Sequence, residues 1–141
     1  MSYTFLDHTA DIAVDVSGQS LEDLFLSAAA AWKESVVEQK EFSGSDTKNI
    51  SIAGDSLEIL LVQFLSELNY FLSTKKWLMN SVEELEIKEQ NNRYHLNARI
   101  YGEAYDPEKH LLKEEIKAIT FHQMEIKKKK NEYFTSIVFD I

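Results

Sequence analysis

The sequence predicts an α+β fold in which two helices pack on one face of a mostly antiparallel β-sheet. Two segments in the first half of the chain carry apolar residues three and four positions apart, which is typical of amphipathic helices. The second half alternates apolar and polar residues instead, as strands covered on one face require. Strands and helices do not alternate regularly along the chain, so a parallel nucleotide-binding sheet is not favoured.

The two helices have clear starting signals. The first is predicted to begin after Ser20, because Asp23 follows three residues later in a capping-box arrangement, and its apolar stripe continues to Val36. The second is expected after the break at Gly54 and to run to about Ser73. Its apolar face is the broader of the two, so it is expected to be the most buried element.

The strands follow from alternation and turn residues. Asn91 and Asn92 are a good turn signal between two alternating segments and predict a hairpin there. A lysine-rich turn over residues 127–131 is expected to join the last two strands. Strands are predicted within residues 5–16, 49–53, 82–88, 93–101, 115–126 and 133–141.

Length and composition narrow the classes of protein. With 141 residues and no linker rich in proline or glycine, residues 1–141 are expected to form a single domain. The chain has no cysteine, which excludes disulfides, thiolate zinc sites and cysteine nucleophiles. The first residues do not resemble a signal peptide, and the most apolar segment is interrupted by polar residues, so we expect a cytoplasmic protein without a membrane span. A formal charge of −9 disfavours binding driven by nucleic-acid phosphates.

Motifs of common enzymes are missing from the sequence. There is no glycine-rich phosphate loop, HExxH or GxSxG, and the four histidines do not share the spacing of a zinc site. This inventory argues against an enzyme. One alternative stays open, in which His8 or His122 works with a neighbouring carboxylate as an acid/base pair.

Acidic groups stand at both ends of the chain. Asp11 lies in an apolar strand near the start, and Asp140 precedes the last residue of the sequence, Ile141. If the first strand lies beside the last, Asp11, Asp140 and the α-carboxylate of Ile141 would form a set of hard oxygens suited to Ca²⁺ or Mg²⁺. In the plainer alternative Asp11 caps a turn and Asp140 faces water, and spacing alone favours that alternative.

Two further features have a structural and a functional interpretation. A lone strand histidine such as His122 is more often hydrogen-bonded within the fold than catalytic. The four lysines of Lys127–Lys130 could contact RNA, but lysines at a hairpin tip usually keep the turn soluble and protect a sheet edge. The structural interpretation is favoured for both.

Three stretches taken together resemble the archease family. They are DHTADIAVDVSGQSLEDLFLSAA near the start, YGEAYDPEKHLLKEEIKAITFHQMEI in the second half and IVFDI at the end. The motifs are HTAD in the first stretch, GE…D…H…EIKA·T·H in the second and FDI in the third. Each motif alone is a modest signal, whereas all three in register form a specific one. Their order and spacing match along essentially the whole chain, although residues 30–80 match mainly in pattern.

The resemblance implies a protein cofactor without an activity of its own. Archeases assist the RtcB-type RNA ligase, which joins tRNA halves and repairs broken RNA with GTP and a divalent metal. They promote guanylylation of the ligase and its multiple turnover. RNA would then be met only through the ligase. A small RNA-binding or chaperone-like module that acts without the ligase is the alternative.

The resemblance also implies site residues. Archeases bind a metal, reported as calcium, through the aspartate of HTAD and the terminal Asp-Ile pair, which correspond here to Asp11, Asp140 and Ile141. The implied cofactor is therefore a divalent metal, Ca²⁺ with Mg²⁺ as the alternative. For contact with the ligase we expect His8, Lys117 and His122, because they lie within the matched motifs.

Overall fold

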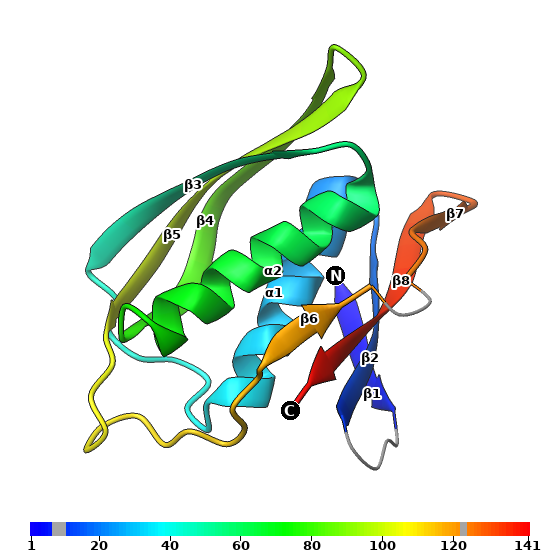
Figure 1. Cartoon of the computed structure of the whole chain (residues 1–141). Helices are drawn as coiled ribbons and strands as arrows, with labels where there is room; N and C mark the ends of the chain where they lie inside the picture. The colour runs from blue at the N-terminus through cyan, green and yellow to red at the C-terminus, as the bar shows by residue number, and fades with distance from the viewer. Residues whose placement is uncertain (7–10, 122–123) are drawn as a thin grey trace.

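Two antiparallel sheets and two helices make up the fold (Figure 1). The computed structural model describes residues 1–6, 11–121 and 124–141. The helices are α1 (Leu21–Val36) and α2 (Leu57–Ser73). The first sheet contains β1 (Ser2–Leu6), β2 (Asp11–Gly18), β6 (Ala118–Thr120), β7 (Lys127–Lys129) and β8 (Glu132–Asp140). The second sheet contains β3 (Asp46–Gly54), β4 (Trp77–Gln90) and β5 (Arg93–Ala104).

The first sheet joins the two ends of the sequence. Its strand order is β1-β2-β8-β6, with β7 also paired to β8, and the second sheet has the order β3-β5-β4. Each pair of neighbouring strands in the described part of the chain is antiparallel. The α+β prediction with two helices and antiparallel strands is confirmed. The strands are divided between two sheets, however, where the sequence predicted one.

Both helices begin where the sequence predicted. The hydroxyl of Ser20 accepts a hydrogen bond from the Asp23 amide at 3.0 Å, and the Asp23 carboxylate accepts one from the Gln19 amide at 3.0 Å. Ser56 caps α2 in the same way, since its hydroxyl accepts from the Ile59 amide at 3.1 Å. These side chains satisfy amide groups that have no partner within the helix.

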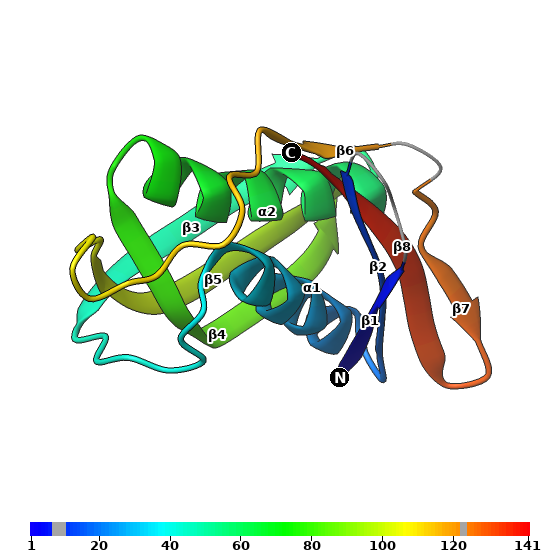
Figure 2. The same ribbon diagram turned by 90° about the horizontal axis from the view of Figure 1, so that it is seen from below.

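Helix α1 has more buried residues than α2, so the expectation that the second helix is the most buried element was wrong. Figure 2 shows α1 between the two sheets, with β1, β2 and β8 on one side and β4 on the other. A helix covered on two sides buries small residues that a one-sided helix would expose. The buried residues of α1 are Leu24, Phe25, Ser27, Ala28, Ala29, Ala31, Trp32, Ser35 and Val36.

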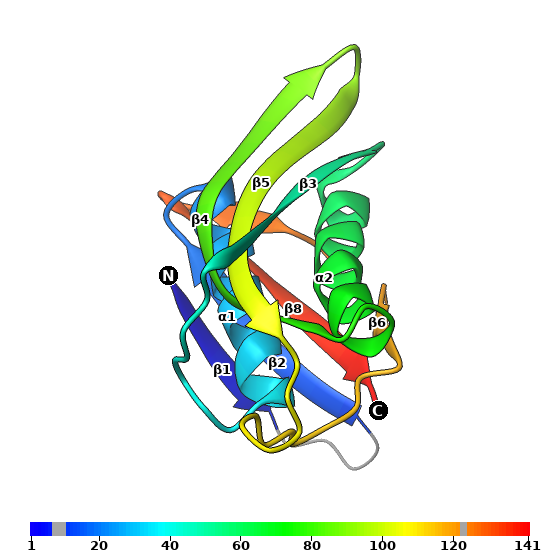
Figure 3. The same cartoon turned by 90° about the vertical axis from the view of Figure 1, so that its left-hand side faces the viewer.

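The hairpin predicted around Asn91 and Asn92 is present. Both asparagines have positive φ angles, 55° and 61°, as a tight two-residue turn between strands requires. Strands β4 and β5 extend beyond the predicted bounds, and their far end projects past the helices in Figures 1 and 3.

The single strand predicted over residues 115–126 was wrong. Among the described residues of this range, 115–121 and 124–126, only β6 is a strand, and it pairs with β8. The backbone on either side of β6 finds partners elsewhere. The Lys113 amide donates to the Val36 carbonyl at 2.9 Å, and the Ile126 amide donates to the Glu58 carboxylate at 2.8 Å. These bonds to helix residues replace a continuous ladder.

A single apolar cluster fills the space between the sheets and includes residues of both helices and both sheets. Within the part of the chain that the structure describes, no helix combines the length and the apolar character needed to cross a membrane.

Candidate functional site

Pairing of β2 with β8 brings the acidic residues of the two chain ends together. Asp11 lies directly opposite Asp140 in the register, and the end of β8 lies beside the start of β2 in Figures 1 and 3. Opposite residues of an antiparallel pair point to the same face, with Cβ atoms about 4.5–5.5 Å apart. The predicted proximity of the first and last strands is therefore confirmed.

This acid pair lies on the face of the first sheet that points away from the helices. Its neighbours along the strands, Ile12 and Phe139, pack into the core, and Phe139 is fully buried. Side chains alternate between faces along a strand, so the two carboxylates take the opposite side. Asp140 is exposed, whereas Asp11 is half-buried and its Oδ1 atom is buried.

Strand β6 pairs with β8 beside the acid pair, and Lys117 directly precedes β6. Ala118 is the register partner of Asp140 in β6. The Lys117 amide donates a hydrogen bond to the Asp140 carbonyl at 2.7 Å, and Lys117 is exposed. The main chain of Lys117, one of the three predicted contact residues, is thus bonded to the main chain of Asp140. The other two, His8 and His122, lie outside the described residues.

Ile141 follows Asp140 at the end of β8. Its half-buried side chain packs against the core cluster, on the same side as Phe139. The side chain therefore anchors the residue that follows β8, and the main chain of Ile141 continues directly from that of Asp140.

The donor set at the acid pair suits a hard cation. Two like-charged carboxylates on neighbouring strands repel each other, and a divalent ion between them removes that repulsion. Carboxylate and carbonyl oxygens are the ligands that Ca²⁺ and Mg²⁺ prefer. In the ranges 1–6, 11–121 and 124–141, no three His, Cys, Asp or Glu side chains gather as a metal site. Side chains of this part of the chain thus offer two carboxylates, and further ligands would come from main-chain oxygens or water.

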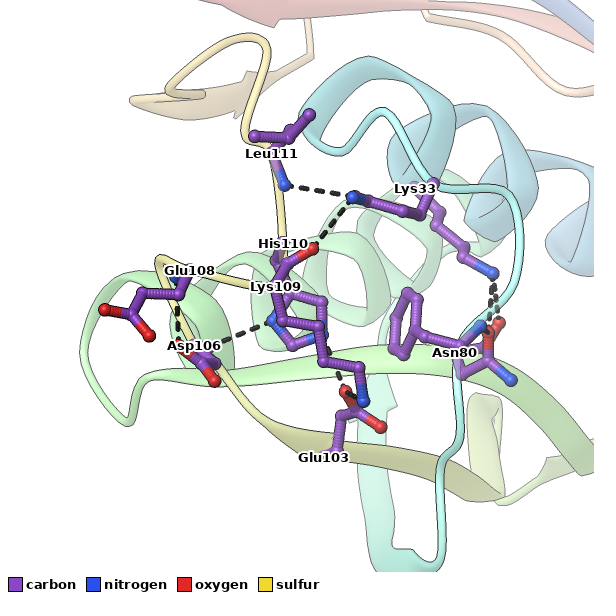
Figure 4. A network of polar contacts seen from close by, with 10 residues as sticks. Lys33, Asn80, Glu103, Asp106, Glu108, Lys109, His110 and Leu111 are labelled. Atoms are coloured by element: carbon purple, nitrogen blue, oxygen red, sulfur yellow. Dashed lines mark hydrogen bonds and ion pairs between the residues drawn. The ribbon is translucent and has the colours of Figure 1, made fainter.

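A second polar cluster lies away from the acid pair, where β5 ends (Figure 4). His110 is 1% exposed and its Nε2 lies 2.7 Å from the Glu103 carboxylate. Its Nδ1 accepts a hydrogen bond from the Asp106 amide at 3.0 Å. The rings of Phe42 and Tyr105 contact the imidazole, with centroid distances of 5.0 and 5.9 Å.

These hydrogen bonds define the state of His110. Because Nδ1 accepts a hydrogen bond from a main-chain amide, it carries no proton itself, and Nε2 donates to Glu103. Burial raises the pKa of Glu103, but hydrogen bonds from Lys109 and His110 and the charge of Lys109 outweigh burial and lower it below the ordinary value. The cluster fixes the segment that follows β5 and leads towards Lys117.

The sequence did not reveal this role. Glu103, Asp106 and His110 were noted only as members of one motif, without a function for each. The one available signal was that Glu103 and Asp106 lie within seven residues of His110 in the sequence. A buried histidine needs a hydrogen-bond partner for each ring nitrogen, and nearby residues can supply both. We assign them to the support of the fold.

Figure 4 also shows Lys33, which connects α1 to β4. Its ammonium group donates to the carbonyl and side-chain oxygens of Asn80 at 2.9 and 2.8 Å. Burial lowers the pKa of Lys33, although the nearby Glu41 opposes this shift. The residue is tied into the fold by these bonds.

The lysines of residues 127–130 are all exposed. Three of them form β7, and the ammonium group of Lys128 lies 5.3 Å from the ring centre of Tyr133. The turn is shorter than predicted, because Lys130 and Asn131 alone connect the strands. Exposure fits both the solubility and the RNA-contact interpretation and does not separate them.

Comparison with known proteins gives consistent matches along the chain. A model of the Archease protein family matches residues 3–141. The protein archease of Methanosarcina barkeri is 35% identical over 139 residues, which cover 99% of this chain and 95% of that protein. The protein archease of Pyrococcus abyssi is 38% identical over 122 residues, covering 86% of this chain and 85% of its own length.

Two solved structures are similar in fold. The solution structure of protein 1598 of Methanobacterium thermoautotrophicum has a TM-score of 0.84 and 27% identity, covering 99% of this chain and 98% of its own. A crystal structure from Thermotoga maritima, described as an archease and possible chaperone, has a TM-score of 0.60 and 24% identity, covering 96% and 94%. The shared fold includes both helices and the antiparallel sheets.

Proposed function

This chain belongs to the archease family, and from that premise we propose that it is a non-enzymatic, metal-binding activator of an RtcB-type RNA ligase. It promotes guanylylation of the ligase and lets the ligase act repeatedly in tRNA splicing and RNA repair. The proposal treats residues 1–141 as one cytoplasmic domain that meets RNA only through the ligase.

The observation that carries the proposal is the position of Asp11 opposite Asp140. Two residues far apart in sequence place their carboxylates on one face of the sheet, at the end of the paired strands β2 and β8, where the apolar strand pattern does not require them. We assign the metal ligands to Asp11, Asp140 and Ile141. The ion is Ca²⁺, with Mg²⁺ as the alternative, because all these donors are hard oxygens.

The protein side chains then act by positioning. Asp11 and Asp140 would hold the ion at this end of the sheet, and its positive charge would offset that of the two carboxylates, so that this end could enter a cleft lined with phosphates. Lys117 is exposed beside Asp140 and contacts the ligase, together with His8 and His122. An ordered surface of this kind aligns groups around the nucleotide, and alignment supplies much of the rate of phosphoryl-type transfer.

The test is an assay of ligase guanylylation with GTP, with and without this protein. We expect stimulation by the wild type and its loss, by about tenfold or more, in Asp11→Asn, since each 1.36 kcal/mol of barrier is tenfold in rate. Asp15→Asn is the matched control, because Asp15 is exposed on the same strand and face, four residues away. Full stimulation by Asp11→Asn, or none by the wild type, would refute the proposal.

The exposed lysines of β7 support a second candidate, an RNA-binding or chaperone-like module that acts without the ligase. It predicts salt-sensitive binding of RNA by the isolated protein that is lost when Lys127–Lys130 are replaced. The activator proposal predicts no such binding at physiological salt.

A further inference from the structure

One peptide unit beside the acid pair is held from both sides. The carbonyl of Ile116 accepts a hydrogen bond from the side-chain amide of Asn69 in α2 at 2.8 Å. The amide of Lys117, which belongs to the same peptide unit, donates to the carbonyl of Asp140 at 2.7 Å. Because a trans peptide unit is planar with its carbonyl and amide pointing apart, the two bonds fix its place between α2 and β8.

The orientation of Asn69 is determined by its second partner. The indole Nε1 of Trp32 donates to the side-chain oxygen of Asn69 at 3.0 Å, and Trp32 is fully buried. An indole nitrogen only donates and a main-chain carbonyl only accepts, so a flipped amide would oppose both partners. Asn69 is therefore held with its oxygen towards α1 and its nitrogen towards Ile116.

Local structure gives no reason for an asparagine at this position. Asparagine is less favourable than alanine or leucine inside a helix, and position 69 lies between the buried Leu68 and the exposed Tyr70. Its two hydrogen bonds instead connect α2 to α1 and to the segment that leads into β6. The bonds then continue through Asp140 to the strand pair that holds Asp11.

We infer that Asn69 is a positioning residue, which fixes the Ile116–Lys117 peptide and thereby sets Lys117 and Asp140 in place at the acid pair. The inference rests on the proposed function, in which the acid pair binds the metal and Lys117 contacts the ligase. Asn69 touches neither the metal nor the ligase in this account. It acts through the backbone of Lys117.

Asn69→Asp is the selective perturbation. An aspartate has the same shape and still accepts from Trp32, but its ionised side chain has no proton to donate to the Ile116 carbonyl. Asn97→Asp is the matched control, since it makes the same chemical change at an exposed position of β5 in the second sheet. Asn69→Ala removes the amide without adding charge and keeps a good helix former, in case the aspartate prevents folding.

Three measurements are made on each variant: amide hydrogen exchange at Lys117, calcium affinity by calorimetry and stimulation of ligase guanylylation. For both Asn69 variants we expect hydrogen exchange at the Lys117 amide to become about fivefold faster or more, because local opening at this peptide no longer breaks the hydrogen bond from Asn69. Exchange in the core strand β5 should stay unchanged. Calcium affinity and stimulation should each fall about fivefold or more, and Asn97→Asp should match the wild type.

The outcomes separate the inference from the proposed function. Unchanged exchange at Lys117 in both Asn69 variants would show that the peptide is not held by Asn69. Faster exchange with unchanged calcium affinity and unchanged stimulation would overturn the positioning role, while the proposed function would stand. A wild type that neither binds calcium nor stimulates the ligase would refute the proposed function, whereas exchange at Lys117 would still report whether Asn69 holds the peptide.

Discussion

Neutralising one member of the acid pair should have opposite effects on stability with and without calcium. Asp11 and Asp140 are register partners on one face of the sheet, and carboxylates about 5 Å apart repel by roughly 1 kcal/mol in water and 3 kcal/mol near a protein surface. Asp140 is exposed, so the lower figure applies. Without calcium, Asp11→Asn should therefore stabilise the fold by about 1 kcal/mol, or raise Tm by about 3 °C.

With calcium the wild type should become more stable than Asp11→Asn. An ion that binds only the folded state stabilises it by about 2.7 kcal/mol at a concentration of 100 Kd, which is roughly 8 °C in Tm for a chain of this size. The wild type and Asp15→Asn should show this shift, and Asp11→Asn should show almost none. The assay is thermal unfolding followed by circular dichroism, with a chelator and then with excess calcium. An Asp11→Asn variant that keeps the full calcium shift would refute the assignment of the ligands.

Three further predictions concern the support of the fold. Gly102→Ala should destabilise the protein by about 3 kcal/mol or more in urea unfolding, because the new Cβ would overlap the main-chain oxygen of Leu78; a loss below 1 kcal/mol would contradict this. His110→Phe should cost about 2–3 kcal/mol, since the Asp106 amide loses its partner, while calcium affinity stays unchanged. The pKa of Glu103 is lowered in the fold, so the ionised carboxylate stabilises the folded state above its ordinary pKa of about 4.5, and this stabilisation is lost as the pH falls through the lowered pKa. The difference in free energy of unfolding between wild type and Glu103→Gln should therefore shrink below about pH 4. A difference that does not change with pH would argue against this role of Glu103.

Local signals in the sequence predicted the features that depend on neighbouring residues. Ser20 and Asp23 marked a helix start, and the two asparagines at 91 and 92 marked a turn, because each acts within a few residues. The proximity of Asp11 and Asp140 was only one of two alternatives that the residues left open, and spacing favoured the other; the family resemblance decided for it. The occupant of the site could be named only through resemblance to a family.

The features that were missed depend on contacts between distant segments. Residues 115–126 alternate like a strand, but Asn69 and Glu58 of α2 supply partners for the backbone on either side of β6 and the ladder stays short. Alternation records which residues are buried and carries no information on which group satisfies each amide. The division into two sheets was missed for the same reason, since strand partners are not visible in a hydrophobic pattern.

Diffraction from crystals grown with calcium would test the central claim most directly. The account predicts one peak of anomalous density between the carboxylates of Asp11 and Asp140, about 2.3–2.6 Å from its oxygen ligands. Density for an ion only at another place, or no ion density beside Asp11 and Asp140 under saturating calcium, would contradict this assignment of the metal site.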